Sequence, residues 1–416
     1  MLSADVAVVG GGPGGAAAAI ALARGGRDVV LVDKARFPRD KACGDGLTTA
    51  ALRRLEELGL RPETVPSWKE VGHVWLRSPT GRLVDLPLPE SQGSFAVVAR
   101  RFDLDAALLD VARSAGVKVH DGHGLVGARW EPGSDSVVLD VDGLGPVRAR
   151  YAIGADGMWS PLRKALGPPE EPGYLGEWHA FRQYFAPVDE PAATAMWVWF
   201  EADLLPGYAW SFPLPGGRAN VGFGIQRRPG QPTRAMKHQW EELLERPHVL
   251  EVLGRGAAPE AAHKAWPIPA RVERTALWGA GGRALFVGDA ARATDPMTGE
   301  GIGQALETGM LAADAVLAAG AMAPARAAAR YQRSVEQGLA VDNRLAGVLS
   351  RALRHRKGAR GAIWMADRTD WTRRHFARWL FEDYPRAAVA TPRRWRRRMF
   401  TGAGAYAATG GVVRPG

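Results

Sequence analysis

Apolar residues in the first part of the chain alternate between short continuous runs and helical spacing. Residues 5–9 and 29–32 are apolar runs that predict buried strands, and the alanine-rich residues 13–24 between them predict a helix. Helical spacing also occurs at residues 52–60 and 103–115. Further strands, separated by Pro-Gly and Asp-Gly turns, are predicted at residues 117–119, 125–130, 137–141 and 147–153. This alternation predicts an α/β fold built on a Rossmann-like sheet.

The pattern changes beyond residue 173, where strands rich in Trp, Tyr and Phe predominate. One helix is predicted near residues 233–244. The first pattern then resumes with an apolar run at residues 284–287 and helical spacing at residues 302–317. The predicted strands of the intervening part are residues 179–185, 195–200, 208–213 and 219–225.

At 416 residues the chain exceeds the usual size of one domain, so we expect more than one. Residues 1–172 and 276–345 are expected to form a nucleotide-binding domain on the Rossmann-like sheet. Residues 173–275 are expected to form an inserted antiparallel-sheet domain that covers a cavity and binds the substrate. Residues 346–416 are expected to form a C-terminal helical region.

The turn after the first predicted strand carries a glycine-rich motif. Gly10, Gly12 and Gly15 fit G-x-G-x-x-G, in which the glycines allow a tight turn, close approach to a pyrophosphate and close helix–strand packing. Asp33 ends the next strand, 23 residues beyond Gly10, where a carboxylate can accept the hydroxyls of an adenosine ribose. The glycines alone could form an ordinary turn. With the flanking strand and helix and this acid, they predict a dinucleotide site.

A second ligand-binding turn is predicted near the end of the Rossmann-like pattern. Residues 288–289 are Gly-Asp, directly after the apolar run, and residues 296–302 are PMTGEGI at the start of the next helix. Backbone N–H groups at such a helix start converge on an electron-rich ligand. Alone, this could be any anion site. Together with the glycine motif it predicts two contacts with a flavin, and the dinucleotide motif favours FAD over FMN.

Composition limits the class of protein. With 46% hydrophobic residues and 51 glycines, the chain is expected to be globular rather than disordered or fibrous. Cys43 is the one cysteine, which excludes an intrachain disulfide, and we expect no metal site. The sequence has no apolar run of about 18 residues, so no spanning helix is expected. We also expect no signal peptide, and therefore a location in the reducing cytoplasm.

The net charge of +10 is concentrated near the C-terminus. Residues 351–400 contain 15 Lys and Arg residues against four acidic ones, together with four tryptophans and three phenylalanines. Arginine mixed with tryptophan suits an anionic surface, so we expect peripheral contact with the inner face of the cell membrane. The alternative is a solvated helix pair packed on the body of the protein. Nucleic acid is not expected as a partner, because no recognised binding module accompanies the charge.

Three further motifs indicate a family. Residues 37–47 are FPRDKACGDGL, residues 154–157 are GADG, and residues 208–213 are YAWSFP, with a G-x-G at residues 222–224. With the two turns above, this set resembles the geranylgeranyl reductase family of p-hydroxybenzoate-hydroxylase-like FAD proteins, over residues 1 to about 345. It is especially similar to actinobacterial reductases that saturate the isoprenoid tail of menaquinone.

The resemblance implies a cofactor site for FAD. It places Gly10, Gly12, Gly14 and Gly15 at the pyrophosphate, Asp33 at the adenosine ribose, Cys43, Gly44 and Gly46 beside the isoalloxazine, Arg101 at the diphosphate or ribityl chain, Leu125 and Val126 at the adenine, Asp156 in a flavin-side turn, Asp289 at the ribityl chain, and Pro296, Gly299, Gly301 and Ile302 at the pyrimidine end of the flavin.

The resemblance also implies a substrate site in the inserted domain. Without the motif, its aromatic residues would be ordinary strand core. Cys43, Tyr208 and an ordered water are the alternatives for a proton donor. His179, Arg182 and Tyr184 alternate on a neighbouring strand and could form a polar tunnel mouth. The expected substrate contacts are Tyr208, Trp210, Phe212, Pro213, Gly222 and Gly224.

The function implied is an FAD-dependent reductase that saturates isolated C=C bonds of a prenyl chain, with a prenyl lipid or other hydrophobic molecule as substrate. NAD(P)H and a ferredoxin-like carrier both stay open as electron donor, because no second G-x-G-x-x-G follows a strand. The alternative is a flavin monooxygenase or halogenase, although residues 208–213 depart from the Trp-x-Trp-x-Ile-Pro of halogenases. A third hypothesis is a flavin-bearing membrane binder or redox sensor without turnover.

Overall fold

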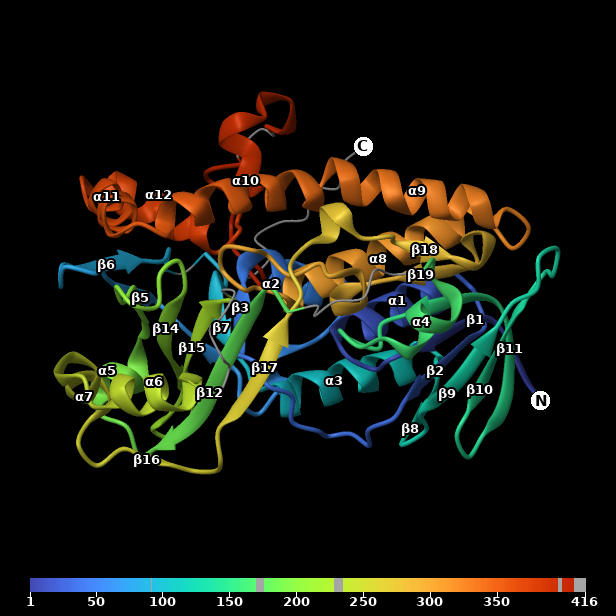
Figure 1. The fold of residues 1–416 in the computed structure, drawn as a ribbon, viewed down its shortest axis with the longest axis horizontal. Coiled ribbons are helices and arrows are strands. Elements are labelled where there is room, and N and C mark those ends of the chain that lie inside the picture. Colours follow the sequence, from blue (N-terminus) through green and yellow to red (C-terminus); the bar gives the residue numbers. More distant parts are fainter. Residues whose placement is uncertain (91, 170–175, 228–234, 396–398, 408–416) are drawn as a thin grey trace.

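The computed structural model describes residues 1–90, 92–169, 176–227, 235–395 and 399–407. A Rossmann-like sheet with its helices forms one lobe, a second sheet forms the other, and C-terminal helices lie across both (Figure 1). Three sequence-based expectations lie outside the described residues. They are the domain boundary at residue 173, the first two residues of the helix at 233–244, and three arginines of the basic region at residues 396–398.

The first sheet has the strand order β18-β19-β11-β1-β2-β8, with β10 and β9 added beside β11. β1 (Leu2–Val9) pairs in parallel with β2 (Val29–Asp33) and with β11 (Gly145–Gly154), and β11 pairs in parallel with β19 (Ala284–Phe286). Parallel neighbours bring their carboxyl ends to one edge, so the turns that follow these strands meet there. The remaining strands are β8 (Lys118–Asp121), β9 (Leu125–Arg129), β10 (Val137–Val141) and β18 (Trp278–Gly279).

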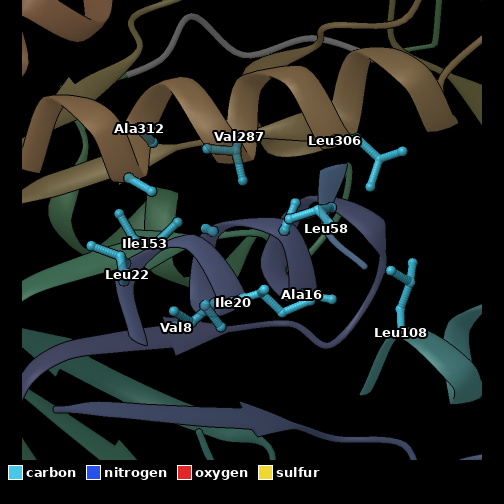
Figure 2. Close-up of a cluster of buried hydrophobic side chains, with 14 of the residues drawn as sticks. Val8, Ala16, Ile20, Leu22, Leu58, Leu108, Ile153, Val287, Leu306 and Ala312 are labelled. Carbon is cyan, nitrogen blue, oxygen red and sulfur yellow. The ribbon is translucent and has the colours of Figure 1, made fainter. Parts of the chain in front are cut away.

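Helix α1 (Pro13–Arg24) connects β1 to β2 and packs between the sheet and α8 (Ile302–Ala319) (Figure 2). Its buried positions are mostly alanine and glycine, which lets the two helix backbones approach closely. A Cβ on Gly309 of α8 would lie 2.2 Å from the carbonyl oxygen of Gly14, so this crossing requires glycine. The apolar core around it includes Val8, Ile20, Leu108, Ile153 and Val287.

The second sheet has the strand order β16-β12-β15-β14-β13-β5-β6, with β17 beside β12, and is antiparallel except where β13 pairs with β5. The strands predicted between residues 179 and 225 are confirmed. We expected residues 73–87 in the nucleotide-binding domain, but they form β5 and β6 and extend this sheet, because their alternating apolar residues share a core with β13. The strands are β5 (His73–Arg77), β6 (Leu83–Pro87), β12 (Trp178–Ala186), β13 (Met196–Trp199), β14 (Tyr208–Leu214), β15 (Arg218–Gln226), β16 (Ala258–Pro259) and β17 (Lys264–Ile268).

A small antiparallel sheet lies in the middle of the molecule, in the order β3-β7-β4 (Figure 1). Its strands are β3 (Gly46–Thr48), β4 (Lys69–Glu70) and β7 (Ala96–Val98). The helices not yet named are α2 (Thr49–Glu57), α3 (Arg101–Ser114), α4 (Pro161–Leu166), α5 (Glu190–Thr194), α6 (Ala235–Leu244) and α7 (Pro247–Leu253). Short 3₁₀ turns are η1 (Pro62–Thr64), η2 (Val272–Arg274), η3 (Ala280–Gly282) and η4 (Gly288–Ala291).

The chain after α8 forms a layer of helices across both lobes (Figure 1). Two of them, which we call the roof, cover the second sheet, and Ile363, Ala377 and Phe381 pack into its core. After the roof the chain returns to the body, where Ala405 forms an antiparallel bridge with Ser94. Within the described residues, no helix is long and apolar enough to span a bilayer. The elements are α9 (Pro324–Gln337), α10 (Leu339–Leu353), the roof helices α11 (Arg356–Ala366) and α12 (Asp370–Leu380), η5 (Arg386–Ala390) and η6 (Pro392–Arg394).

Candidate active site

A cavity of about 1560 Å³ extends from the glycine turn after β1 to the roof. Its walls come from the edge of the first sheet, from residues 39–48, from one face of the second sheet and from helices α10 to α12. Pockets for one small ligand usually enclose about 300–1,000 Å³. The cavity is therefore large enough for a long ligand, or for two ligands held side by side.

The glycine turn forms the first wall of the cavity. Gly10 has φ +108°, and a Cβ there would lie 2.2 Å from the carbonyl oxygen of Ala155, so both conformation and space require glycine. At Gly12 the atoms nearest to a Cβ are guanidinium nitrogens, 3.6 Å away in Arg101 and 3.7 Å away in Arg39. The first N–H groups of α1 and two guanidinium groups therefore border one space, which fits a diphosphate.

The two arginines at this turn share one buried carboxylate. Arg101 donates from Nε and Nη2 to the two oxygens of Asp105 at 2.7 and 2.6 Å, and Arg39 Nη1 lies 2.8 Å from the same group. Burial opposes the charge of Arg101, but Asp105 outweighs it and raises the pKa of Arg101. Two cations around one anion leave a net positive charge, which is the complement of a phosphate group.

Asp33, at the end of β2, borders the cavity beside the glycine turn. Its carboxylate accepts the N–H of Gly11 at 2.7 Å and the N–H of Ala35 at 2.8 Å. These two bonds fix the orientation of the carboxylate while lone pairs remain for further donors. A ribose diol is a donor of the right kind, so the position fits the role that the glycine motif predicts.

The second predicted turn lies at the same edge of the sheet. Asp289 follows β19 and borders the cavity, where its carboxylate pairs with Lys41 Nζ at 3.1 Å. Gly301 caps the start of α8 without a side chain. At Gly299, with φ +71°, a Cβ would meet no atom within 4 Å. The start of α8 therefore opens to the cavity, and a helix N-terminus stabilises negative charge there by up to ~1 kcal/mol.

Asp295 holds the loop of residues 294–301 in shape. Its Oδ1 accepts the N–H of Met297 at 2.8 Å, and the N–H and hydroxyl of Thr298 at 2.7 and 3.0 Å. The backbone N–H of Asp295 in turn donates to the carbonyl of Glu300 at 2.8 Å. One buried carboxylate thus determines the conformation of the loop that presents the N-terminus of α8.

The segment from Cys43 to Gly46 lines the cavity beside strand β14 of the second sheet. Trp210 and Phe212 of β14 lie against it, since a Cβ on Gly44 would meet both rings at 3.6 Å. Burial and the neighbouring Asp45 raise the pKa of Cys43 to about 11, so its thiol is protonated at neutral pH.

A buried polar cluster supports this segment from behind. Asp45 is fully buried, and its carboxylate accepts the hydroxyl of Tyr184 at 2.6 Å and the amide of Asn220 at 2.8 Å. Asn220 also donates to the carbonyl of Cys43 at 2.9 Å and accepts the indole N–H of Trp210 at 3.2 Å. Burial raises the pKa of Asp45 to about 6. The cluster connects residues 43–45 to strands β12, β14 and β15.

The motif at residues 208–224 has a physical explanation in the second sheet. Tyr208 pairs directly with Gly224, and Trp210 pairs directly with Gly222, across β14 and β15. A Cβ on Gly222 would lie 2.4 Å from the ring of Trp210, so glycine is required for the indole to lie flat on the neighbouring strand. The hydroxyl of Tyr208 donates to the carbonyl of Thr298, and burial raises the pKa of Tyr208.

Most of the cofactor residues predicted from the sequence border the cavity, but several do not. Val126 is 74% exposed and points away, although Leu125 beside it lines the cavity. Gly15 lies beneath the turn, where a Cβ would be 1.8 Å from the carbonyl oxygen of Gly10. Pro296 lies outside the lining, where its carbonyl accepts the hydroxyl of Ser350. The predicted residues in the lining are Gly10, Gly12, Gly14, Asp33, Cys43, Gly44, Gly46, Arg101, Leu125, Asp156, Asp289, Gly299, Gly301 and Ile302.

The predicted substrate residues are divided in the same way. Tyr208, Trp210, Phe212 and Gly224 line the cavity, whereas Pro213 and Gly222 do not. The polar tunnel mouth expected on β12 is absent from the lining. Arg182 instead pairs with Asp40 at 2.6 Å, and Tyr184 with Asp45, so both hold the segment of residues 40–45 in place. His179 is also buried, at 6% exposure.

Sequence reasoning missed four contributions to the site. Arg39 and Lys41 belong to the motif at residues 37–47. Their positive charge could have identified them as ligands of the predicted phosphate groups. Glu300 also lines the cavity, and burial together with Glu382 raises its pKa to about 8. The roof is the fourth contribution, and Trp379 of α12 lines the cavity there. The sequence pattern does not show that these C-terminal helices fold back over the second sheet.

Comparison with known proteins identifies the ligand that this geometry fits. The FAD binding domain family matches residues 3–333. This chain belongs to that family. This flavoprotein is accordingly an FAD-dependent oxidoreductase, and the two turns, Asp33 and the cationic pair at Gly12 lie within the matched residues.

Curated relatives show which members of this family the chain is similar to. The flavoprotein is 36% identical to a menaquinone reductase of Mycolicibacterium smegmatis, over 76% of this chain and 77% of the relative. It is 34% identical to digeranylgeranylglycerophospholipid reductase 1 of Methanopyrus kandleri, over 76% of this chain and 80% of the relative. The sequence-based expectation of a geranylgeranyl reductase-type protein is thereby confirmed.

Solved structures confirm the fold. A geranylgeranyl bacteriochlorophyll reductase-like protein from Thermoplasma acidophilum has a TM-score of 0.78 and 22% identity, covering 95% of this chain and 100% of that one. The halogenase PltM in complex with phloroglucinol and FAD has a TM-score of 0.69 and 18% identity, covering 97% of this chain and 88% of that one. Both likenesses establish the p-hydroxybenzoate-hydroxylase-like fold that the flavoprotein shares with reductases and halogenases alike.

Proposed function

We propose that this flavoprotein saturates isolated carbon–carbon double bonds in the isoprenoid chain of a membrane lipid, such as a menaquinone or a geranylgeranylated lipid. The names of its curated relatives support this substrate class. The structural feature that carries the proposal is the part of the cavity between the segment of residues 43–46 and the roof.

This part of the cavity is apolar and continuous with the FAD site. An isoprenoid chain offers no hydrogen-bonding group, so it binds by burying apolar area, at about 25 cal/mol per Å². Aromatic and aliphatic walls meet that requirement, whereas a small polar aromatic substrate would need more polar groups than these walls supply. The wall residues include Val74, Leu76, Met196, Leu349, Phe376 and Trp379.

The chemistry requires one hydride and one proton for each double bond. An isolated alkene has no carbonyl to polarise it, so the proton must arrive at one carbon as hydride reaches the other. When bound, reduced FAD supplies the hydride. The ring of Trp210 lines the cavity and can stabilise positive charge that develops on the more substituted carbon.

We infer that Cys43 delivers the proton. Its thiol is protonated at neutral pH, and Cys43 lines the cavity next to Gly44, against which the rings of Trp210 and Phe212 lie. Transfer of the S–H proton to the alkene carbon leaves a thiolate, which regains a proton from water before the next turnover. Tyr208, the other residue considered, already donates its hydroxyl to the carbonyl of Thr298.

The cavity reaches the surface at the roof, which suits a substrate taken from a bilayer. Trp364, Met365 and Trp371 line the cavity and are 46%, 61% and 63% exposed. The guanidinium of Arg368 lies 4.6 Å from the ring of Trp364. Exposed basic residues on and beside the roof are Arg351, Arg354, Arg356, Lys357, Arg360, Arg368 and Arg374.

We propose that this surface rests on an anionic membrane while the lipid chain enters between the roof helices and the second sheet. Tryptophan suits the headgroup region, and each basic residue near an anionic leaflet contributes about 1 kcal/mol. The roof also packs into the core of the second sheet, so membrane contact and structural packing are not alternatives here. Ile363 and Ala377 supply the packing, whereas Trp364 and Trp371 of the same two helices are exposed.

The decisive experiment is anaerobic incubation of the chemically reduced holoenzyme with vesicles that contain menaquinone or geranylgeranyl lipids. We expect product masses that increase by two hydrogen atoms per saturated bond, with no oxygen incorporated. Trp210→Ala is the matched variant, which should retain FAD and lose most turnover. Oxygen-dependent addition of an oxygen atom to an aromatic substrate, without alkene reduction, would show that the flavoprotein is a monooxygenase instead.

A further inference from the structure

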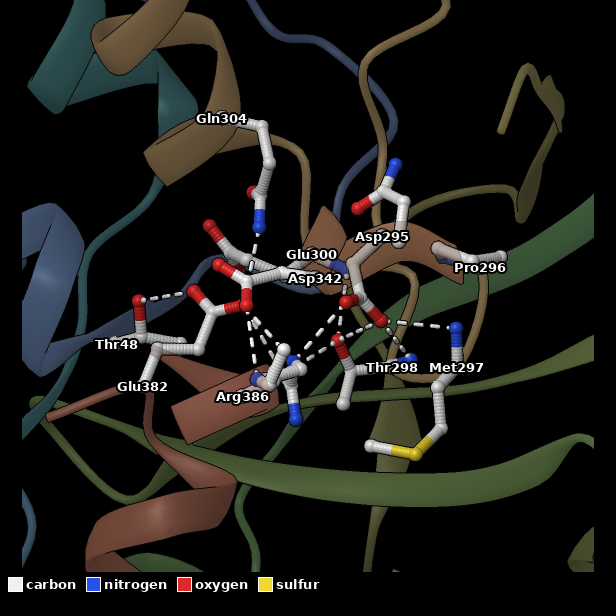
Figure 3. A network of polar contacts seen from close by, with 12 residues as sticks. Thr48, Asp295, Pro296, Met297, Thr298, Glu300, Gln304, Asp342, Glu382 and Arg386 are labelled. Carbon is white, nitrogen blue, oxygen red and sulfur yellow. Dashed lines mark hydrogen bonds and ion pairs between the residues drawn. The ribbon is translucent and has the colours of Figure 1, made fainter. Parts of the chain in front are cut away.

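The C-terminal segment buries an arginine against the loop of residues 294–301 (Figure 3). Arg386, the first residue of η5, is 1% exposed, and Asp295 beside it is also 1% exposed. A guanidinium is costly to bury unless it is paired with acceptors of good geometry. Its position therefore indicates a specific role for the contacts that it makes.

Arg386 holds the carboxylate that shapes the loop. Its Nε lies 3.0 Å from Oδ2 of Asp295, while the other oxygen of Asp295 binds the N–H groups of Met297 and Thr298. Its Nη2 donates to the hydroxyl of Thr298 at 3.2 Å. The guanidinium thus contacts both the residue that organises the loop and a residue at its tip.

The same guanidinium connects the loop to two other segments through Glu382. Nη2 of Arg386 lies 3.1 Å from Oε1 of Glu382, which also accepts the amide of Gln304 in α8 at 3.1 Å. Oε2 of Glu382 accepts the hydroxyl of Thr48, the N-cap of α2, at 3.3 Å. The start of α8 is therefore held from the C-terminal segment on two sides.

We propose that Arg386 is a positioning residue for the flavin, acting through Asp295 and Thr298 on the loop that presents the N-terminus of α8. The proposal rests on the FAD site and not on the identity of the substrate. Asp295 and Glu382 both pair with this one guanidinium (Figure 3). Removing it leaves uncompensated negative charge beside the pyrimidine end of the flavin, which disfavours both ordered binding and reduction of the cofactor.

The test compares Arg386→Met and Arg386→Lys in the full chain. The readouts are the dissociation constant for FAD, measured by titrating the apoprotein, and the midpoint potential of the bound flavin. We expect Arg386→Met to raise the dissociation constant by about tenfold or more and to make the potential more negative. Arg386→Lys should restore most of the potential but only part of the affinity, because lysine keeps the charge without the planar fork.

The chain offers a matched control in Arg378. It is 6% exposed, pairs with Asp383, and donates to the carbonyls of Phe400 and Gly402 at 2.8 Å, all within the C-terminal segment. Arg378→Met should lower thermal stability while changing neither the FAD affinity nor the potential. An equal shift of both quantities in this control would overturn the proposal, because general loosening of the segment would then explain them.

A milder variant covers the case in which Arg386→Met does not fold. Thr298→Val removes the hydroxyl that Arg386 contacts in the loop but leaves the ion pairs with Asp295 and Glu382 intact. We expect it to weaken FAD binding by about threefold to tenfold, because the hydroxyl's hydrogen bonds with Asp295, Glu300 and Arg386 are all lost. Wild-type affinity and potential in Thr298→Val would contradict a role for Arg386 in placing the loop.

Discussion

Replacing Tyr208 with phenylalanine separates two roles that its hydroxyl could have. The hydroxyl donates to the carbonyl of Thr298, so it ties β14 of the second sheet to the loop at the start of α8. It also lines the cavity, where it could be a proton donor. Burial raises the pKa of Tyr208, so the phenol is protonated at neutral pH under either role.

The two roles predict effects of different size. Loss of a structural hydrogen bond costs about 0.5–1.5 kcal/mol, which corresponds to a factor of about 2 to 13 in an equilibrium or a rate. Loss of a general acid costs about 10²–10⁴ in the chemical step. Because the hydroxyl is engaged with a backbone carbonyl, we expect the smaller effect, shared between weaker FAD binding and slower turnover.

The assay is anaerobic single-turnover oxidation of the reduced holoenzyme by its lipid, with FAD affinity measured separately. Tyr151→Phe is the matched control, because the hydroxyl of Tyr151 also donates to a backbone carbonyl, that of Gly320, at 2.7 Å and outside the cavity. It should lower stability by a similar amount and leave the rate unchanged. A rate at least a hundredfold slower in Tyr208→Phe, with normal FAD affinity, would refute the structural role and identify Tyr208 as the acid.

Three further predictions concern the cofactor, pH and the membrane. The denatured protein should release FAD and not FMN. Gly12→Val and Asp289→Ala should each lose the flavin while the chain stays folded, which flavin absorbance and circular dichroism will measure. Full retention of FAD in both variants would contradict the site. Burial raises the pKa of Glu300 from 4.5 to about 8, so its contribution to stability is complete below pH 4.5 and is lost as pH rises toward 8. The melting temperature of Glu300→Gln should therefore depend less on pH between pH 5 and 8 than that of the wild type. An unchanged dependence would rule out a raised pKa for Glu300. Trp371→Ala should bind less to liposomes containing cardiolipin. Trp278→Ala should bind normally, because Trp278 is exposed and belongs to β18, which lies at the opposite end of the molecule from the roof helices (Figure 1). Equal binding by the two variants would show that the roof does not contact the membrane.

Local patterns were sufficient to predict the first lobe. The strands at both ends of α1, the glycine turn and Asp33 follow each other closely in sequence, so period, turn residues and motif spacing describe one continuous unit. The aromatic strands after residue 173 were predicted for the same reason. Successive side chains of these strands point to opposite faces of the sheet, so that one face lines the cavity and the other packs into a core.

The parts that were missed depend on contacts between distant segments. β5 and β6 join the second sheet although about 120 residues separate β5 from its neighbour β13, and no local pattern specifies that partner. Arg386 contacts Asp295 across a similar distance in sequence, and in the sequence it is one of 15 basic residues in the last part of the chain. Composition suggested a membrane-facing region or a solvated helix pair for this part of the chain. The structure buries Arg386 and Arg378, because each has carboxylate partners in the fold.

The return of the C-terminal segment to the loop at the start of α8 also has a consequence for biosynthesis. The glycine turn and Asp33 leave the ribosome early, whereas Asp289, the loop and Arg386 follow only after more than two thirds of the chain has been made. The residues that we expect to bind the adenosine half of the cofactor are therefore made well before those that we expect around the flavin ring. We therefore expect tight binding of FAD only once Arg386 has been made, and a chain that ends before Arg386 should bind FAD more weakly than the full chain.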